Sequence, residues 1–330
     1  MLYQFTSFLI LVLAFILSSQ ATAAEPTSPK QLLLISFDGA GDNALWERSR
    51  DFAQTVDARF TYFLSCTLVI PRPDSTSYKG PHHKAGRSNI GFAQDVEEVR
   101  TRLTHIWKAK LEGHEIASHT CGHFDGADWT KLDWVAEMTS FRSILSNAWA
   151  SIDAATDEPE GWKAFVADID GFRAPYLSAP DSLFAAERSE GFTYDASTVS
   201  NGPTMPVDKN GVMHFGLPLI PEGPRQRPII AMDYNLFVRH SSGVENSSRA
   251  DEFEERAYSA FRAAFDNQYK GKRIPLQIGL HFVEMNGGAY WRAMERLVSE
   301  VCGLKDVGCV TYAQALQEIN TTDASQSSGF

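Results

Sequence analysis

The residues of this chain whose types and spacing most directly suggest chemistry are two histidines, His119 and His123, in the stretch ASHTCGHFDG. On a helical turn, histidines four residues apart present their rings on one face and can chelate one divalent metal ion. Neutral imidazoles suit zinc, and cobalt and nickel are alternatives. The spacing alone also fits two structural histidines. However, the pair follows a strand-like run, HEIAS, and carboxylates follow other such runs. We therefore interpret the pair as a metal site.

A carboxylate, Asp38, ends the apolar run QLLLISF and is followed by glycine at positions 39 and 41. Strand interiors do not usually end in this way. Backbone without side chains beside a carboxylate suggests that another group comes close to it. Asp38 is therefore a candidate for proton transfer or for metal binding.

The stretch FRAPY contains Arg173 and Tyr176. The residue before Pro175 is held extended, so the turn is rigid, and a rigid turn can direct a backbone N–H at a developing oxyanion. Arg173 needs a counter-charge if it is buried, and Asp233 of AMDYN is the candidate. The alternative is a structural ion pair between arginine and aspartate that has no chemical role.

His281 follows a further apolar run, IPLQIGL. A histidine at a strand end can serve as a general acid once a neighbouring carboxylate adjusts its pKa. The alternative is a core histidine whose ring is satisfied by hydrogen bonds.

The segments that position these residues alternate between strand and helix patterns. Runs at 31–37, 59–66 and 114–118 predict strands, and apolar residues at helical spacing predict helices over 96–113, 130–152 and 249–269. This alternation implies parallel pairing and right-handed crossovers. We expect an α/β fold, a distorted (β/α) barrel of about seven parallel strands, with its chemistry at the carboxyl ends of the strands. The residues expected to converge there are Asp38, His119, Arg173, Asp233 and His281.

Five stretches, taken together and in order, resemble the motifs of the polysaccharide deacetylases of carbohydrate esterase family 4, the NodB homology domain. They are SFDGA, HTCGH, RAPY, AMDYN and GLH. The family reads Thr-Phe-Asp-Asp-Gly, His-Ser/Thr-x-x-His, Arg-x-Pro-Tyr, an aspartate-bearing strand and Leu-x-His. The second and third motifs match fully, the fifth fairly well and the fourth loosely. The resemblance covers roughly residues 31–316.

The resemblance implies a metal-dependent enzyme that hydrolyses carbon–nitrogen bonds other than peptide bonds and removes N-acetyl groups from a polysaccharide or oligosaccharide. It implies metal binding by His119 and His123, general base catalysis by Asp38, general acid catalysis by His281, oxyanion binding by the metal and the backbone N–H of Tyr176, and orientation of base and acid by Arg173 and Asp233.

The first motif departs from the family, because Gly39 stands where the family has a second, metal-binding aspartate. Several readings stay open. Asp38 is the base, or Asp38 is the third metal ligand and no base remains. Asp42, or less directly Asp125, supplies the missing carboxylate. Alternatively, catalysis is lost and the chain is a carbohydrate-binding protein. A further alternative is a small-molecule amide hydrolase that the long loop at 71–94 closes. We favour an active deacetylase, because the other motif residues remain together.

Residues 1–23 have the pattern of a secretory signal peptide, with no charged side chain, an apolar run at 8–17 and small residues before a cut after Ala23. We expect a secreted or periplasmic protein with a single deacetylase-like barrel domain over 24–330 and a disordered tail at about 321–330. The formal net charge of −11 argues against nucleic acid and anionic membranes as partners. The expected partner is an acetylated carbohydrate.

The chain has four cysteines, and an even count in a secreted protein favours disulfides. Cys302 and Cys309 bracket a short loop and are expected to pair. Cys66 and Cys121 are then left to form the second bond.

Overall fold

The computed structural model describes residues 29–327, with side chains described as far as Thr321. The expected signal peptide at 1–23 lies outside the described residues, as do 328–330. Between residues 29 and 327, no helix combines the length and the apolar character needed to cross a membrane.

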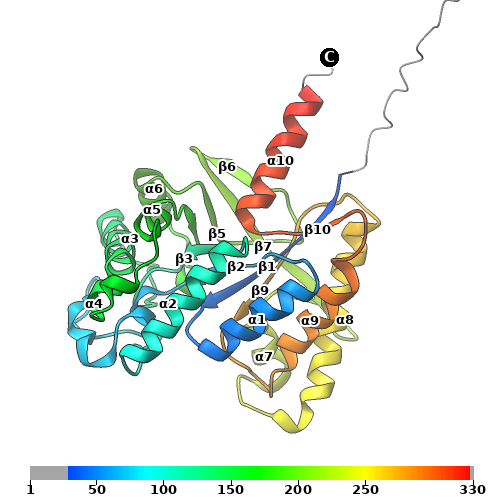
Figure 1. Ribbon diagram of the computed structural model, residues 1–330. Helices are drawn as coiled ribbons and strands as arrows, with labels where there is room; N and C mark the ends of the chain where they lie inside the picture. The colour runs from blue at the N-terminus through cyan, green and yellow to red at the C-terminus, as the bar shows by residue number, and fades with distance from the viewer. Residues whose placement is uncertain (1–28, 328–330) are drawn as a thin grey trace, which may run out of the picture.

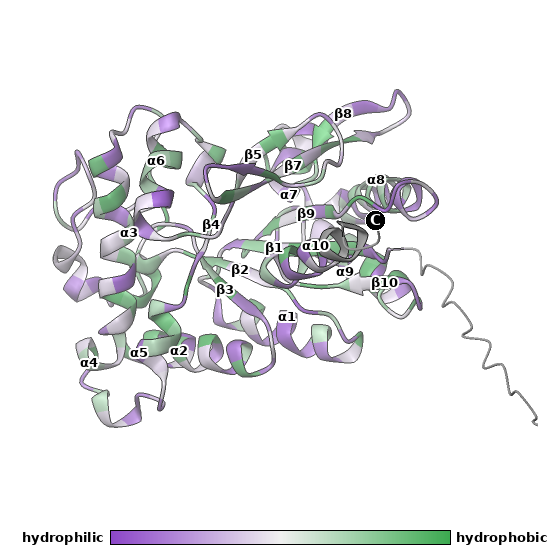
Figure 2. Cartoon of the chain, turned by 90° about the horizontal axis from the view of Figure 1, so that it is seen from above, coloured by the Kyte–Doolittle hydropathy of each residue, from purple (hydrophilic) through white to green (hydrophobic). Residues whose placement is uncertain are grey.

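The strands form one curved, mostly parallel sheet with helices around it (Figure 1 and Figure 2). They are β1 (Gln31–Gly39), β2 (Thr61–Leu64), β3 (Glu115–Ser118), β4 (Gly171–Phe172), β5 (Tyr194–Ser200), β6 (Val207–Lys209), β7 (Val212–Glu222), β8 (Arg227–Ile230), β9 (Leu276–His281) and β10 (Val307–Cys309).

Seven of these strands follow one another in parallel pairs, in the order β9, β1, β2, β3, β4, β5 and β7. β10 pairs with the amino-terminal part of β1, while β6 and β8 pair antiparallel with β7. A parallel bridge between Met232 and Gly279 links the segment after β8 to β9, so a continuous ladder does not close the ring. The expected α/β fold, a distorted barrel of about seven parallel strands, is confirmed.

The helices lie at or near the expected positions, and polar side chains set several of their first turns. Asp42 and Asp95 each accept a backbone N–H three residues on, and Thr130 forms a capping box with Asp133. The bounds are α1 (Asn43–Thr55), α2 (Val96–Leu111), α3 (Lys131–Ser146), α4 (Ala148–Ser151), α5 (Trp162–Ala167), α6 (Asp181–Glu190), α7 (Asp233–Ser241), α8 (Ala250–Tyr269), α9 (Ala289–Val301) and α10 (Tyr312–Ser327).

Three features differ from the sequence-based expectations. The helix expected over 130–152 divides at Asn147 into α3 and α4. The patterns do not predict β5 and β7, because β5 is largely polar and β7 contains Pro218 and Pro221, which disfavour a central strand. The tail expected to be disordered from about 321 continues α10 as far as Ser327, and this helix projects from the body of the molecule (Figure 1).

β1 is buried along its whole length and contributes to two separate cores, one on each face. Positions 33, 35 and 37 join the large cluster between the sheet and the helices, whereas 32 and 34 join a smaller cluster with Phe63, Tyr194 and Tyr312. Because side chains alternate along a strand, positions 36 and 38 continue the face of the smaller cluster. The strand therefore carries Asp38 on its inward face at its carboxyl end.

An aromatic cluster holds the backbone that follows β1. Trp46 of α1 packs against Tyr62 with ring centroids 4.2 Å apart, and its Nε1 donates to the carbonyl of Ala40 at 2.9 Å. Phe282, directly after β9, packs against Phe37 with centroids 5.5 Å apart. The ends of β1 and β9, which carry Asp38 and His281, are thus fixed by the same apolar packing.

Both expected disulfides are confirmed. Cys66 pairs with Cys121 across a sequence separation of 55, and Cys302 pairs with Cys309 across a separation of 7. The first bond joins the segment after β2 to the segment after β3, and the second joins the residue that follows α9 to the last residue of β10.

The two disulfides should differ in how much they stabilise the fold. On chain-entropy grounds, the double substitution of Cys66 and Cys121 by serine should lower the free energy of unfolding by about 4 kcal/mol, and that of Cys302 and Cys309 by about 2 kcal/mol. Denaturant unfolding of the oxidised proteins measures both. An equal loss in the two variants would contradict the chain-entropy account.

Candidate active site

A cavity of about 710 Å³ opens at the carboxyl ends of β1, β3 and β9. The structure brings five of the predicted residues to its wall, namely Asp38, His119, His123, Tyr176 and His281. Two others, Arg173 and Asp233, are fully buried and each is hydrogen-bonded to a residue of this wall.

The Arg173 side chain lies in the barrel interior and holds Asp38 in place. Its Nη1 donates to Asp38 Oδ1 at 2.7 Å and to Ser36 Oγ at 2.9 Å. Its Nη2 donates to Tyr312 Oη at 2.9 Å, and the guanidinium lies 4.1 Å from the ring centroid of Phe63. Arg173 is 0% exposed and Asp38 is 4% exposed. Two opposite charges are thus desolvated together, with hydrogen bonds to both.

The electrostatic environment keeps Asp38 ionised. Burial by itself raises the pKa of this carboxyl, but the positive charge of Arg173, with smaller contributions from His119 and His281, outweighs burial and holds the pKa below its usual range. A carboxylate at neutral pH is the form that accepts a proton.

The prediction that Asp233 is the counter-charge of Arg173 is wrong, because Asp38 has that position. Arg173 and Asp38 both face the barrel interior, whereas Asp233 begins α7 and accepts hydrogen bonds from His281. Periodicity shows which residues end strands, but the register between strands decides which of them meet.

His119 has a fixed tautomer. Its Nδ1 lies 2.7 Å from the backbone carbonyl oxygen of Arg173, which can only accept, so Nδ1 carries the proton and Nε2 a lone pair. Nε2 is buried and has no hydrogen-bond partner among the described residues. Burial lowers the pKa of His119 to about 3, which keeps the imidazole neutral. A buried, neutral and unpartnered ring nitrogen is the form that binds a metal.

His123 lies beside His119, with ring centroids 5.0 Å apart, and burial lowers its pKa as well. The two rings meet on a loop and not on the helical turn that the spacing predicts. Thr120 and His123 have φ values of 60° and 52°, in the left-handed region. Backbone strain of this kind is maintained only where the surroundings hold it, and it is frequent at functional sites.

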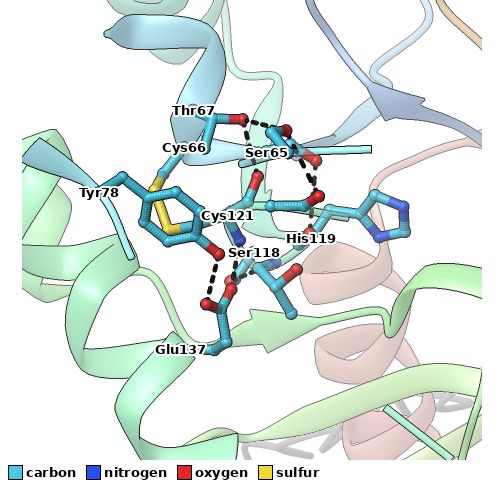
Figure 3. The surroundings of a disulfide bond; sticks show 11 residues. Ser65, Cys66, Thr67, Tyr78, Ser118, His119, Cys121 and Glu137 are labelled. Carbon is cyan, nitrogen blue, oxygen red and sulfur yellow. Dashed lines mark hydrogen bonds between the residues drawn. A yellow bond between two sulfur atoms is a disulfide. The ribbon is translucent and has the colours of Figure 1, made fainter. Parts of the chain in front are cut away.

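A disulfide and a buried carboxylate hold this loop (Figure 3). Glu137 of α3 accepts the backbone N–H of Cys121 at 2.9 Å and the hydroxyl of Tyr78 at 2.6 Å. On the other side, Thr67 Oγ1 donates to the carbonyl of Cys121 at 2.9 Å. Figure 3 shows these contacts around the Cys66–Cys121 bond, with His119 beside them. The disulfide is therefore part of the support for the histidine pair.

Tyr176 sits on the turn that the sequence predicts to be rigid. Its φ is 59°, again left-handed, and its side chain is 58% exposed at the mouth of the cavity. The ring centroid lies 5.1 Å from that of His123, and Asn89 Nδ2 donates to the phenol oxygen at 3.3 Å. The strained turn thus places the Tyr176 ring beside His123.

His281 is the second side chain at the cavity that is paired with a charged residue. Asp233 Oδ1 lies 2.7 Å from His281 Nδ1, and Oδ2 accepts the backbone N–H of His281 at 2.8 Å. Burial lowers the pKa of His281, but the Asp233 carboxylate outweighs burial and raises it above its usual value. This carboxylate also fixes the proton on Nδ1, which leaves Nε2 as the position that exchanges protons.

Of the three carboxylates considered as a third metal ligand, Asp38 lines the cavity, whereas Asp42 and Asp125 do not. Asp42 Oδ1 accepts the N–H of Leu45 at 2.9 Å, which caps α1. Asp125 is exposed and accepts the hydroxyl of Ser178. At Gly39, φ is 90°, and an added Cβ would lie 2.9 Å from Ile90 Cδ1. The backbone conformation here is strained for an aspartate, whose Cβ would also displace the end of the Ile90 side chain.

Sequence reasoning missed several residues that complete the site. Ser36 and Tyr312 bind the Arg173 guanidinium from inside the barrel, and only the alternation along β1 pointed to Ser36. Asn89 lines the cavity as well.

No protein-family model and no curated protein matches the sequence. A proposed polysaccharide deacetylase from Mycobacterium smegmatis, a solved structure, matches with a TM-score of 0.55 at 16% identity, over 90% of this chain and 95% of that one. This chain therefore shares the fold of that protein. This agrees with the fold that the motifs imply.

Two further solved structures are less similar. The carbohydrate esterase family 4 domain of a multidomain xylanase, from the hindgut metagenome of Trinervitermes trinervoides, has a TM-score of 0.47 at 14% identity, over 88% of this chain and 92% of that one. A pseudoenzyme of the same family from Bacillus anthracis has a TM-score of 0.46 at 12% identity, over 88% of this chain and 66% of that one.

The substitution Asp233→Asn should lower the pKa of His281. Because the folded-state pKa is raised, protonated His281 contributes stability below its unfolded pKa of about 6.5, and this contribution is lost as pH rises through the folded value. The variant should lose that pH-dependent contribution. NMR titration of His281, with the remote substitution Asp208→Asn as control, measures the shift. An unchanged pKa of His281 in Asp233→Asn would contradict this account.

The substitution His123→Ala should weaken zinc binding by at least about 100-fold, since even outer groups around a metal contribute 10–100-fold. His123 is a better target than His119, whose buried hydrogen bond also supports the fold. The matched control is His83→Ala, because the His83 ring stacks on Phe124 and does not line the cavity. Calorimetric titration with zinc compares the variants, and equal affinity in parent and His123→Ala would exclude this pair as the site.

Proposed function

We propose that this protein is a secreted, metal-dependent hydrolase that removes N-acetyl groups from an acetylated carbohydrate. The main observation in support is that two side chains at one cavity are each paired with a charged residue behind them. Asp38 is paired with Arg173, and His281 is paired with Asp233. An ionised carboxylate and an imidazole with a raised pKa are a base and an acid that can act in the same reaction.

A divalent metal fits the histidine pair, and the orphaned Nε2 of His119 supports this placement. We expect zinc, with cobalt and nickel as alternatives. When bound, the metal would polarise the acetamide carbonyl and lower the pKa of a water molecule. The described residues contain no group of three or more histidine, cysteine, aspartate and glutamate side chains placed to hold a metal. Metal affinity should therefore be lower than that of a three-ligand site.

The chain's own residues supply the proton transfers. Asp38 takes a proton from the water that attacks the carbonyl carbon, and Arg173 keeps this carboxylate in position. The backbone N–H of Tyr176 is the proposed donor to the oxyanion. His281 delivers a proton to the amide nitrogen as the carbon–nitrogen bond breaks, and Asp233 stabilises the protonated ring. The products are acetate and a free amine.

A second candidate, a small-molecule amide hydrolase, is supported by the lining of the cavity. Asn89 and Ile90 of the long loop at 71–94 form part of its wall, so this loop narrows the space around the candidate catalytic groups. Many of the other lining side chains are apolar, among them Leu68, Ile230, Met232, Phe282 and Val283. Indifference of the rate to oligosaccharide length would favour this candidate.

Acetate release from acetylated oligosaccharides, measured with added zinc and with chelator, tests the proposal. The substitution Asp38→Asn should retain zinc and lower turnover by roughly 10²–10⁴-fold, because an amide cannot accept the proton. It also leaves Arg173 without its counter-charge, so circular dichroism must show that the variant folds.

Asp42→Asn is the matched control, because asparagine caps helices as well as aspartate does. Loss of zinc in Asp38→Asn would make Asp38 a ligand, and loss of zinc in Asp42→Asn would assign that role to Asp42. Undiminished turnover in Asp38→Asn would refute Asp38 as the base.

A further inference from the structure

Two aliphatic side chains lie directly against the glycines that follow Asp38. A Cβ added to Gly39 would lie 2.9 Å from Ile90 Cδ1, and a Cβ added to Gly41 would lie 3.0 Å from Leu68 Cδ1. Both distances are shorter than ordinary contacts between carbon atoms. The absence of side chains at 39 and 41 is therefore what lets Ile90 and Leu68 approach the end of β1.

These contacts make one part of the cavity apolar next to the candidate base. Ile90 and Leu68 line the same cavity as Asp38, together with Phe282 and Val283 after β9. Hydroxyl groups of a sugar would lose hydrogen bonds to water against such a surface, whereas an alkyl chain would gain from burial there. This surface is suited to the acyl part of a substrate.

Hydrogen bonds hold the Ile90 segment in place. Ser88 Oγ accepts the N–H of Ile90 at 3.2 Å and lies 3.1 Å from Thr67 Oγ1. The N–H of Asn89 donates to the carbonyl of Gly122, one residue before His123, at 2.8 Å. Ile90 is thus fixed to the same loops that carry the histidine pair, and the apolar surface is formed before any ligand arrives.

We propose that Ile90 and Leu68, packed on Gly39 and Gly41, form an acyl subsite that selects N-acyl groups longer than acetyl. The subsite rests on the proposed function, since the bond that is cut is still the amide between acyl carbon and amine nitrogen. The products are then a longer carboxylate and the free amine.

The test uses the zinc-loaded mature protein and a series of N-acetyl-, N-butyryl- and N-hexanoylglucosamine, with release of glucosamine as the readout. Each methylene that the subsite buries should raise kcat/KM about fourfold, the equivalent of ~0.8 kcal/mol. The butyryl substrate should therefore exceed the acetyl substrate by roughly 15-fold. Equal or faster cleavage of the acetyl substrate would overturn the proposal.

Two matched isoleucine variants locate the effect. Ile90→Ala should reduce the ratio of butyryl to acetyl kcat/KM to nearly one, because it removes the side chain that covers Gly39. Ile230→Ala removes the same atoms from the part of the cavity wall at the end of β8 and should leave that ratio unchanged. An unchanged ratio in Ile90→Ala would also overturn the proposal.

A binding measurement separates this proposal from the proposed function. If no glucosamine appears from any substrate, the proposed hydrolase function fails. Saturation-transfer NMR with the same three ligands then still tests the subsite. Tighter binding of the butyryl than of the acetyl ligand in the parent, and loss of this difference in Ile90→Ala, would support it. Equal binding of both ligands would refute it.

Discussion

The buried ion pair between Arg173 and Asp38 is the interaction on which the rest of the site depends. Neither side chain could remain charged alone at this depth, because an unpaired charge in the barrel interior would be strongly unfavourable. Arg173 also binds Ser36 and Tyr312, so its guanidinium connects β1, β4 and the start of α10. Arg173 matches the arginine of a catalytic motif, and its hydrogen bonds also connect several elements in the interior of the barrel.

Arg173 also connects the two chemical parts of the site. Its guanidinium holds the Asp38 carboxylate, while its backbone carbonyl accepts the proton of His119 Nδ1 and thereby frees Nε2. The candidate base and the candidate metal ligand are therefore positioned by one residue. The His281–Asp233 pair lies on the other side of β1, and there too one charged side chain positions another. In this pair the Asp233 carboxylate positions the His281 imidazole, whereas in the other pair the Arg173 guanidinium positions the Asp38 carboxylate.

The position at which the chain departs from the deacetylase motif has its own structural solution. Gly39 does not leave empty space, because Ile90 from the loop at 71–94 lies against it. The same loop is tied to the histidine-bearing segment through Ser88, Asn89 and Gly122. At position 39 the chain therefore lacks the second carboxylate of the family motif and has instead an apolar contact with Ile90. The cavity combines an ionised carboxylate, Asp38, which Arg173 holds in position, with apolar side chains in its walls.

The sequence by itself determined the parallel barrel, the residues at its strand ends and both disulfides. Strand and helix periodicities are local properties, and four cysteines with one short loop leave few pairings. Tertiary structure decided which strand-end residues meet. Arg173 pairs with Asp38 and not with Asp233, since the register between strands sets which side chains share the interior. It also decided that left-handed backbone, and not a helix, brings His119 and His123 together. The contact of Ile90 with Gly39 joins residues about fifty positions apart, and local sequence patterns do not predict contacts between residues so far apart.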